Sequence, residues 1–194
     1  MSMSSGRHPG PPQVGLSVAL VEAIVAHARA DYPNEACGVI VGDGSPADGG
    51  VALRWVPMRN EYASPLRYRI NAQDLYPVLV EVEDSDDLAF WAIVHSHVRS
   101  AAYPSPTDVA QAVFPDALYL LVSLEADEPA LRAYRIVGGT IFPVELMVGI
   151  GGGGRRACIP GLGMGDVRTT RAATEPGSTT NRSARVGRRR GRRE

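Results

Sequence analysis

Apolar and polar residues follow one another along this 194-residue chain in patterns that predict helices and strands. After Ser17, a candidate N-cap, apolar residues recur at helical spacing until Pro33, which predicts a first amphipathic helix. A second helix is expected at 72–83, despite a proline inside it. A short third helix is expected around 107–113, with Thr107 as its candidate N-cap.

Short apolar and β-branched runs, separated by turns rich in Gly, Pro, Asp and Ser, predict the strands. These runs cover residues 36–41, 51–56, 88–94, 117–124, 130–137 and 140–148. The 88–94 run is apolar throughout, which indicates a buried strand ending just before His95. Strands mixed with helices in this order predict an α/β domain, layered, with a mixed sheet flanked by helices.

Both ends of the chain differ in composition from the part between them. Residues 1–15 are rich in Gly, Pro and Ser without periodicity, so we expect a disordered leader. Residues 149–194 contain mainly Gly, Arg, Ser and Thr, which cannot bury enough apolar surface to offset their ordering entropy. We therefore expect a disordered tail and one folded domain over 16–148.

The formal net charge of −1 conceals an uneven distribution. Residues 1–150 hold nine Arg against 18 acidic residues, whereas residues 151–194 hold eleven Arg against three. The basic tail is either an inert extension or an arm that contacts RNA, DNA or another acidic surface. We expect nucleic acid as a partner only through this tail.

Several classes of protein are excluded by what the sequence lacks. No stretch approaches the roughly 18 consecutive apolar residues of a membrane-spanning helix, and the N-terminus has no apolar signal-peptide core. We therefore expect a cytoplasmic protein with no membrane partner. Cys37 and Cys158 form neither a disulfide framework nor a Cys-x-x-Cys motif, so His and carboxylate side chains would have to hold any metal.

The segment after the 88–94 run carries the candidate metal chemistry. Residues i and i+2 of an extended chain point to the same side, so His95 and His97 project together. A catalytic zinc takes three protein ligands and leaves a fourth position open, and a carboxylate is a common third ligand. Asp108, at the start of the next predicted helix, is the best-placed carboxylate.

Two further residues are candidates for proton transfer and charge stabilisation. Glu35 lies where the first helix gives way to a strand, beside a small apolar run, and a buried carboxylate there is costly without a partner or a function. It is the candidate base that takes a proton from water and passes it to the leaving nitrogen. Ser105 is a candidate donor to the oxyanion of a tetrahedral intermediate.

Each of these residues has a simpler interpretation when taken alone. A His pair at a strand end is often only polar decoration of the surface. Asp108 suits the first turn of a helix, Ser105 a helix cap, and Glu35 a solvated charge. Cys37 is better interpreted as a small core residue than as a nucleophile, because no base lies near it in sequence. The conjunction of ligands, base and oxyanion donor favours a metallohydrolase.

These five candidates resemble, in type and spacing, the motif of the JAMM (MPN+) zinc metallopeptidases, a family of isopeptidases. The matching positions are Glu35, His95-x-His97 and Ser105-x-x-Asp108. The resemblance covers about residues 14–147 and implies the layered MPN fold. Within the family, the HSH and AYPSPTD segments look most like the Mec-type branch of actinobacteria, which releases cysteine from the C-terminus of a ubiquitin-like sulfur carrier.

The resemblance also implies a role for each matching residue. It makes zinc the cofactor, with ligands His95, His97 and Asp108, and it makes Glu35 the general acid/base and Ser105 the oxyanion-stabilising serine. It implies as partner a sulfur carrier with a Gly-Gly-Cys-type C-terminus, acted on in cysteine biosynthesis. Val98 departs from the Pro that many members carry after the second His. The alternatives are a non-catalytic MPN-type scaffold and a JAMM peptidase that acts on another ubiquitin-like conjugate.

Overall fold

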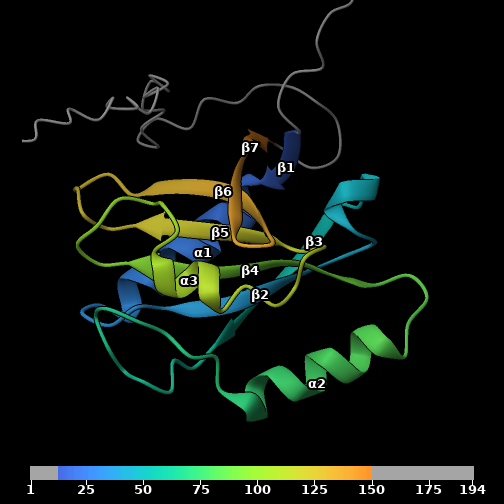
Figure 1. Cartoon of the computed structure of the whole chain (residues 1–194), viewed down its shortest axis with the longest axis horizontal. Coiled ribbons are helices and arrows are strands. Elements are labelled where there is room, and N and C mark those ends of the chain that lie inside the picture. Colours follow the sequence, from blue (N-terminus) through green and yellow to red (C-terminus); the bar gives the residue numbers. More distant parts are fainter. Residues whose placement is uncertain (1–12, 150–194) are drawn as a thin grey trace, which may run out of the picture. The chain divides into compact units, whose positions relative to one another are not determined.

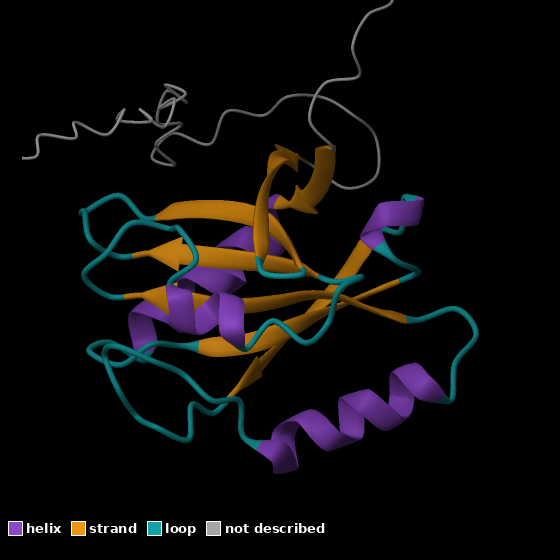
Figure 2. Ribbon diagram, in the orientation of Figure 1, coloured by secondary structure: helices purple, strands orange, loops and turns teal. Residues whose placement is uncertain are grey.

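The computed structural model describes residues 13–149, which form a mixed sheet and its flanking helices (Figures 1 and 2). Within these residues, seven strands lie in the order β1-β7-β6-β5-β4-β2-β3. The strands are β1 (Gln13–Ser17), β2 (Cys37–Gly42), β3 (Ala52–Met58), β4 (Ala89–His97), β5 (Leu118–Ser123), β6 (Ala130–Val137) and β7 (Thr140–Gly149). The helices are α1 (Val18–Ala30), α2 (Ala72–Glu83), α3 (Pro106–Ala110) and the single 3₁₀ turn Pro46–Asp48. The predicted α/β class with a mixed sheet is confirmed.

The connections in the sheet determine what lies at the end of β4. Strand β4 pairs with β2 in antiparallel fashion and with β5 in parallel fashion. Parallel neighbours cannot be joined by a tight turn, so the chain must cross over between them. That crossover carries α3 past the end of β4, which brings a helix N-terminus close to the two histidines.

Two hydrophobic clusters cover the two faces of the sheet. Helix α1 packs a stripe that includes Ile24 against one face, and Val78 of α2 and Val109 of α3 pack against the other. Along β4, Val94 belongs to the α1 side and Ile93 to the opposite side, as strand alternation requires. Figure 1 shows α1 behind the sheet and α3 in front of it.

The first two helices form where the sequence predicts them. Ser17 caps α1, because its hydroxyl accepts a hydrogen bond from the backbone N–H of Leu20 at 3.2 Å. Helix α2 spans the predicted range and is capped by Asn71, although Pro77 lies inside it. None of the helices within residues 13–149 combines the length and apolar character needed to cross a membrane.

The predicted end of the strand before His95 is wrong. Strand β4 continues through both histidines, because its backbone remains paired as far as His97 opposite Ser123 of β5. The sequence prediction ended the strand where the apolar run ended. Backbone pairing continues beyond that point because it does not depend on side-chain polarity.

The predicted third helix is also misplaced. Helix α3 is shorter than expected, and its N-cap is Ser105 rather than Thr107. Proline suits the first helical position, since it lacks the N–H that has no partner there, and Pro106 occupies it. The helix therefore begins one residue after Ser105.

The remaining difference lies at the N-terminal end. Residues 13–15, expected in the leader, belong to β1, which pairs in parallel with β7. This pairing joins segments more than 100 residues apart, so local composition carries no sign of it. Gly149, expected in the tail, is likewise the last residue of β7 and pairs with Ser17. The rest of the predicted leader and of the predicted tail lies outside the described residues, and the domain boundaries stay a prediction.

Candidate metal centre

Strand β4 carries both candidate histidine ligands into the interior. In the register of the sheet, His95 lies opposite Cys37 of β2 and Leu121 of β5. His95 and His97 share the face of Ile93, and the two residues are only 1% and 5% exposed. Their common orientation, expected from the i, i+2 spacing, is present because the strand is extended through both residues.

The third candidate ligand reaches the histidines from the first turn of α3. Ser105 and Asp108 form a capping box: the Asp108 carboxylate accepts from the Ser105 backbone N–H at 2.7 Å, and the Ser105 hydroxyl accepts from the Asp108 N–H at 3.2 Å. The same local motif therefore fixes both the carboxylate and the serine. The Ser105 hydroxyl accepts through a lone pair, which leaves its own hydrogen available to donate.

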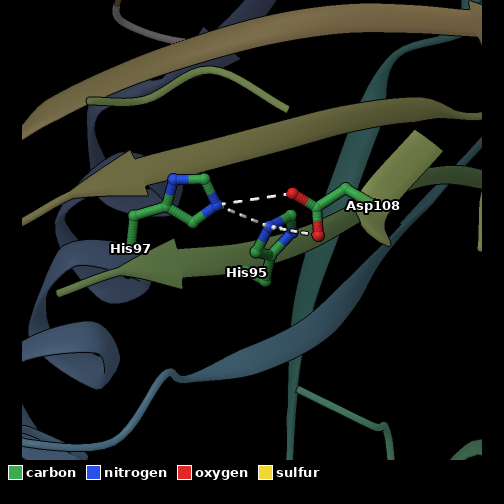
Figure 3. A group of neighbouring side chains, drawn as sticks. All are labelled: His95, His97 and Asp108. Carbon is green, nitrogen blue, oxygen red and sulfur yellow. Dashed lines mark hydrogen bonds and ion pairs between the residues drawn. The ribbon is translucent and has the colours of Figure 1, made fainter. Parts of the chain in front are cut away.

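The side chains of His95, His97 and Asp108 converge on one point (Figure 3). The Nε2 atoms of His95 and His97 are 3.1 Å apart. Nε2 of His95 lies 3.3 Å from Oδ1 of Asp108, and Nε2 of His97 lies 3.5 Å from Oδ2. A tetrahedron with zinc–ligand bonds of about 2.0–2.1 Å has edges of about 3.3 Å. Each histidine nitrogen thus lies about one such edge from the other nitrogen and from one of the two Asp108 oxygens, so the three residues fit a metal ion.

Burial and hydrogen bonding also set the charges of the three side chains. Burial lowers the pKa of His95. Burial by itself would raise the pKa of Asp108, but its hydrogen bonds with both histidines hold it well below the usual range. Burial would lower the pKa of His97, but its bonds with Asp108 and with the Ala101 carbonyl outweigh burial and raise it. A metal ion that binds here therefore has an ionised carboxylate to pair with.

Glu35 is positioned by the strand pairing next to the histidines. Cys37 pairs with His95, and the antiparallel alignment continues one step further, where the Ser96 N–H donates to the Ala36 carbonyl at 2.9 Å. The Ser96 hydroxyl accepts from the Ala36 N–H at 2.8 Å. Glu35 precedes Ala36 and lines the same pocket as His97.

The Glu35 carboxyl is buried and its acidity is altered. It is 6% exposed, and burial raises its pKa to about 7, against the opposing effect of His97 and with a small reinforcement from Asp108. A group that titrates near neutral pH can both accept and return a proton, as a general acid/base must.

A pocket of about 160 Å³ joins these residues to the surface. Glu35, His97, Ser105 and Asp108 line it together with the segment 65–68. The side chain of His95 is fully buried and stacks against the Tyr68 ring. The structure thus brings all five predicted site residues together at one pocket and its base; their catalytic roles stay predictions.

The structure reveals two further residues that contact the site. The sequence did not single out Tyr68, whose ring stacks on His95, or Asn60, whose side-chain amide donates to the Glu35 carbonyl at 2.9 Å. Both lie in an aperiodic segment, and their partners are 25 or more residues away in sequence.

Cys37 is confirmed as a buried core residue. Burial raises the pKa of its thiol to about 12, so the thiol is not suited to act as a nucleophile.

Comparison with known families and proteins gives consistent matches. The family model described as prokaryotic homologs of the JAB domain matches residues 17–137. The CysO-cysteine peptidase of Mycobacterium tuberculosis is 45% identical over 123 residues, which cover 63% of this chain and 82% of that protein. The desampylase of Haloferax volcanii is 33% identical over 107 residues, which cover 53% of this chain and 74% of that protein.

A solved structure has a similar fold. The solution structure of a protein from Desulfitobacterium hafniense superimposes with a TM-score of 0.62 at 26% identity and covers 71% of this chain and 93% of its own.

Proposed function

The chain belongs to the family of prokaryotic homologues of the JAB domain, and from that premise we propose that it is a zinc-dependent hydrolase of amide bonds. Its proposed reaction releases cysteine from the C-terminus of a ubiquitin-like sulfur-carrier protein. The identity to the CysO-cysteine peptidase supports this choice of substrate, because it extends over most of that relative.

The observation that carries the proposal is the cluster of His95, His97 and Asp108 beside a buried acid. Two histidine nitrogens and one carboxylate, close together, supply the three protein ligands of a catalytic site, which keeps its fourth position for water or substrate. Zinc bound there supplies a Lewis acid that polarises a carbonyl and lowers the pKa of a bound water to about 7. A non-catalytic scaffold needs neither this donor set nor a buried carboxylate next to it.

Glu35 performs the proton transfers in the proposed reaction. With its pKa raised to about 7, the carboxylate takes a proton from the attacking water and delivers it to the departing nitrogen. The carbonyl carbon thereby becomes a carboxyl group and the released cysteine leaves with a free amine. Glu35 is regenerated at the end of the cycle.

Ser105 stabilises the charge that develops on the carbonyl oxygen. Its hydroxyl accepts the capping bond from Asp108 and retains a hydrogen that can be donated to an oxyanion. Because the same bond holds the hydroxyl in place, this donor is oriented before substrate binds.

The size of the pocket restricts the form of the substrate. A volume of about 160 Å³ admits the end of a peptide chain and excludes a folded domain. The proposed carrier therefore presents an extended C-terminal tail, and its folded part remains outside.

A second candidate function shares the same site. The identity to the desampylase favours hydrolysis of another ubiquitin-like conjugate. In that reaction the carrier's C-terminal carbonyl is joined to a protein amine rather than to cysteine, while the roles of Glu35 and Ser105 are unchanged.

Metal analysis of protein purified without chelators tests the proposed metal chemistry. We expect about one zinc per chain in the wild type and a strong loss of zinc in His95→Ala. Substoichiometric zinc that His95→Ala leaves unchanged would overturn the proposed function.

A further inference from the structure

The two histidines of the metal centre are held in different ways. His97 has a hydrogen-bond partner on the far side of its ring, because its Nδ1 lies 2.9 Å from the Ala101 carbonyl oxygen and 3.2 Å from the Ser100 hydroxyl. The Nδ1 of His95 is buried and has no hydrogen-bond partner among residues 13–149. Metal-binding histidines almost always have such a partner, which fixes the tautomer and the ring orientation. Another contact must therefore orient the His95 ring.

Tyr68 makes the contact that His95 otherwise lacks. The two ring centroids are 4.3 Å apart and the ring planes are inclined by only 21°, so the rings are stacked. A stacked ring restricts tilting of its neighbour while it allows the edge of that neighbour to remain free. The free edge of His95 carries Nε2, which faces Asp108.

One side chain, that of Asn60, bonds to the backbone on both sides of Tyr68. The Asn60 side-chain amide donates to the Arg67 carbonyl at 3.2 Å, and its oxygen accepts from the Arg69 N–H at 3.0 Å. These two bonds bracket Tyr68. The same amide donates to the Glu35 carbonyl at 2.9 Å, so the segment that supplies the stacking ring is tied to the backbone of the proposed base.

A second bond ties the same segment to Glu35. The backbone N–H of Glu35 donates to the Ser64 carbonyl at 2.9 Å. Both backbone polar groups of Glu35 are thus bonded to the segment 60–70, and Tyr68 projects from that segment onto His95. The arrangement determines the position of the stacking ring independently of the metal.

We propose that Tyr68 is a positioning residue of the metal centre, whose ring orients His95 by stacking where other metal-binding histidines use a hydrogen bond to the second nitrogen. The inference rests on the proposed metal-dependent function. It assigns the effect to the aromatic plane of Tyr68 and not to its hydroxyl. Loss of the ring should therefore weaken metal binding even in a protein that folds normally.

Titration with cobalt(II), whose visible spectrum reports ligand geometry, and competition for zinc against a chelator test this role. Tyr68→Leu should weaken zinc binding by about 10–100-fold and change the cobalt spectrum. Tyr68→Phe retains the ring and should lose less than about tenfold in affinity, with the spectrum of the wild type. Tyr76→Leu is the matched control, because Tyr76 is 68% exposed on α2.

Thermal unfolding of the metal-free variants separates positioning from folding. If Tyr68→Leu does not fold, Tyr68→Met retains buried volume without a ring and should show the same weakened binding. Wild-type affinity in a folded variant without a ring would overturn the inference and leave the proposed function intact. A loss in Tyr68→Phe equal to that in Tyr68→Leu would overturn it also, because the hydroxyl would then carry the effect. A wild type that binds neither metal would overturn the proposed function itself.

Discussion

The strand side and the loop side of the metal centre are built by different kinds of interaction. His95 and His97 form the strand side and lie on β4, whose backbone is paired with β2 around His95 and with β5 through both histidines. The loop side consists of Glu35, Tyr68 and Asp108, which lie outside the strands. On the loop side, side-chain hydrogen bonds and a few isolated backbone bonds take the place of a continuous ladder.

The two sides differ in how many bonds hold each residue in place. A ladder contains many equivalent backbone bonds, so a single side-chain change in β4 alters a ligand without moving the strand. Asn60 and Ser105 each provide several of the bonds that orient the loop side. Substitutions on the loop side are therefore expected to change geometry as well as chemistry, and the following predictions proceed from the largest expected effect to the smallest.

Removal of the ligand on the loop side should have the largest effect. Asp108→Ala leaves two protein ligands and removes the negative charge next to the histidines, so zinc affinity should fall by more than about 100-fold and turnover should disappear. Zinc content and hydrolysis are measured together, with the exposed Asp116→Ala as control. Retention of zinc by a folded Asp108→Ala would mean that the third ligand is a different residue.

Glu35→Gln should separate catalysis from metal binding. The amide keeps the shape of the side chain but cannot accept the proton, so turnover should fall by about 10²–10⁴-fold while zinc content stays at the wild-type level. Glu22→Gln on the exposed face of α1 is the matched control. A variant that remains fully active would show that another group is the base.

Ser105 has both a structural and a proposed chemical role, and two substitutions distinguish them. Ser105→Ala removes the cap and the hydroxyl, so it should lose about 10²–10³ in rate and about 1 kcal/mol of stability. Ser105→Gly also removes the hydroxyl, but glycine at an N-cap costs only a few tenths of a kcal/mol, so this variant should lose rate but little stability. Wild-type turnover in Ser105→Gly would show that Ser105 acts only as a cap.

Asn60 tests how far the loop side depends on one residue. Asn60→Ala removes the hydrogen bonds that bracket Tyr68 and the bond to Glu35, which should lower the free energy of unfolding by about 2–4 kcal/mol. Chemical denaturation measures this loss, and the exposed Gln73→Ala on α2 should show almost none. Equal stability of the two variants would mean that the segment is held by other contacts.

The raised pKa of Glu35 should be visible in the stability of the metal-free protein. Its pKa rises from 4.5 to about 7 on folding because of burial, so the folded state holds the proton more tightly than the unfolded state. Below pH 4.5 the carboxyl is protonated in both states and does not lower the free energy of unfolding. That free energy should decline as the pH rises from 4.5 to 7, because the unfolded state ionises first. Between pH 5 and pH 8, Glu35→Gln should gain on the order of 2 kcal/mol relative to the wild type. A difference that does not change with pH would contradict the burial of this carboxyl.

The elements predicted most accurately from the sequence are those whose pattern lies within a few neighbouring residues. The periodicity and the cap at Ser17 place α1, and the i, i+2 spacing of His95 and His97 places two side chains on one face. The end of β4 and the pairing of β1 with β7 depend on backbone partners far away in sequence, which local patterns do not contain.

The two sides of the site differ in the same way: the strand side depends on local spacing, and the loop side depends on partners far away in sequence. Residue type, place in the sequence and the match to a known motif all pointed to Glu35, Ser105 and Asp108, yet their positions depend on contacts that none of these signals specifies. Tyr68 and Asn60 had no sequence signal, because stacking and side-chain hydrogen bonds across 25 or more residues become apparent only in the folded chain.

The mass of a carrier protein after incubation tests the central proposal most directly. The substrate is a ubiquitin-like sulfur carrier bearing C-terminal cysteine, the enzyme is the zinc-loaded full chain, and Glu35→Gln is the inactive control. We expect the wild type to remove the mass of one cysteine residue, to lose this activity on chelation and to regain it with zinc. A carrier of unchanged mass in the presence of zinc-loaded, folded wild type would contradict the proposed reaction.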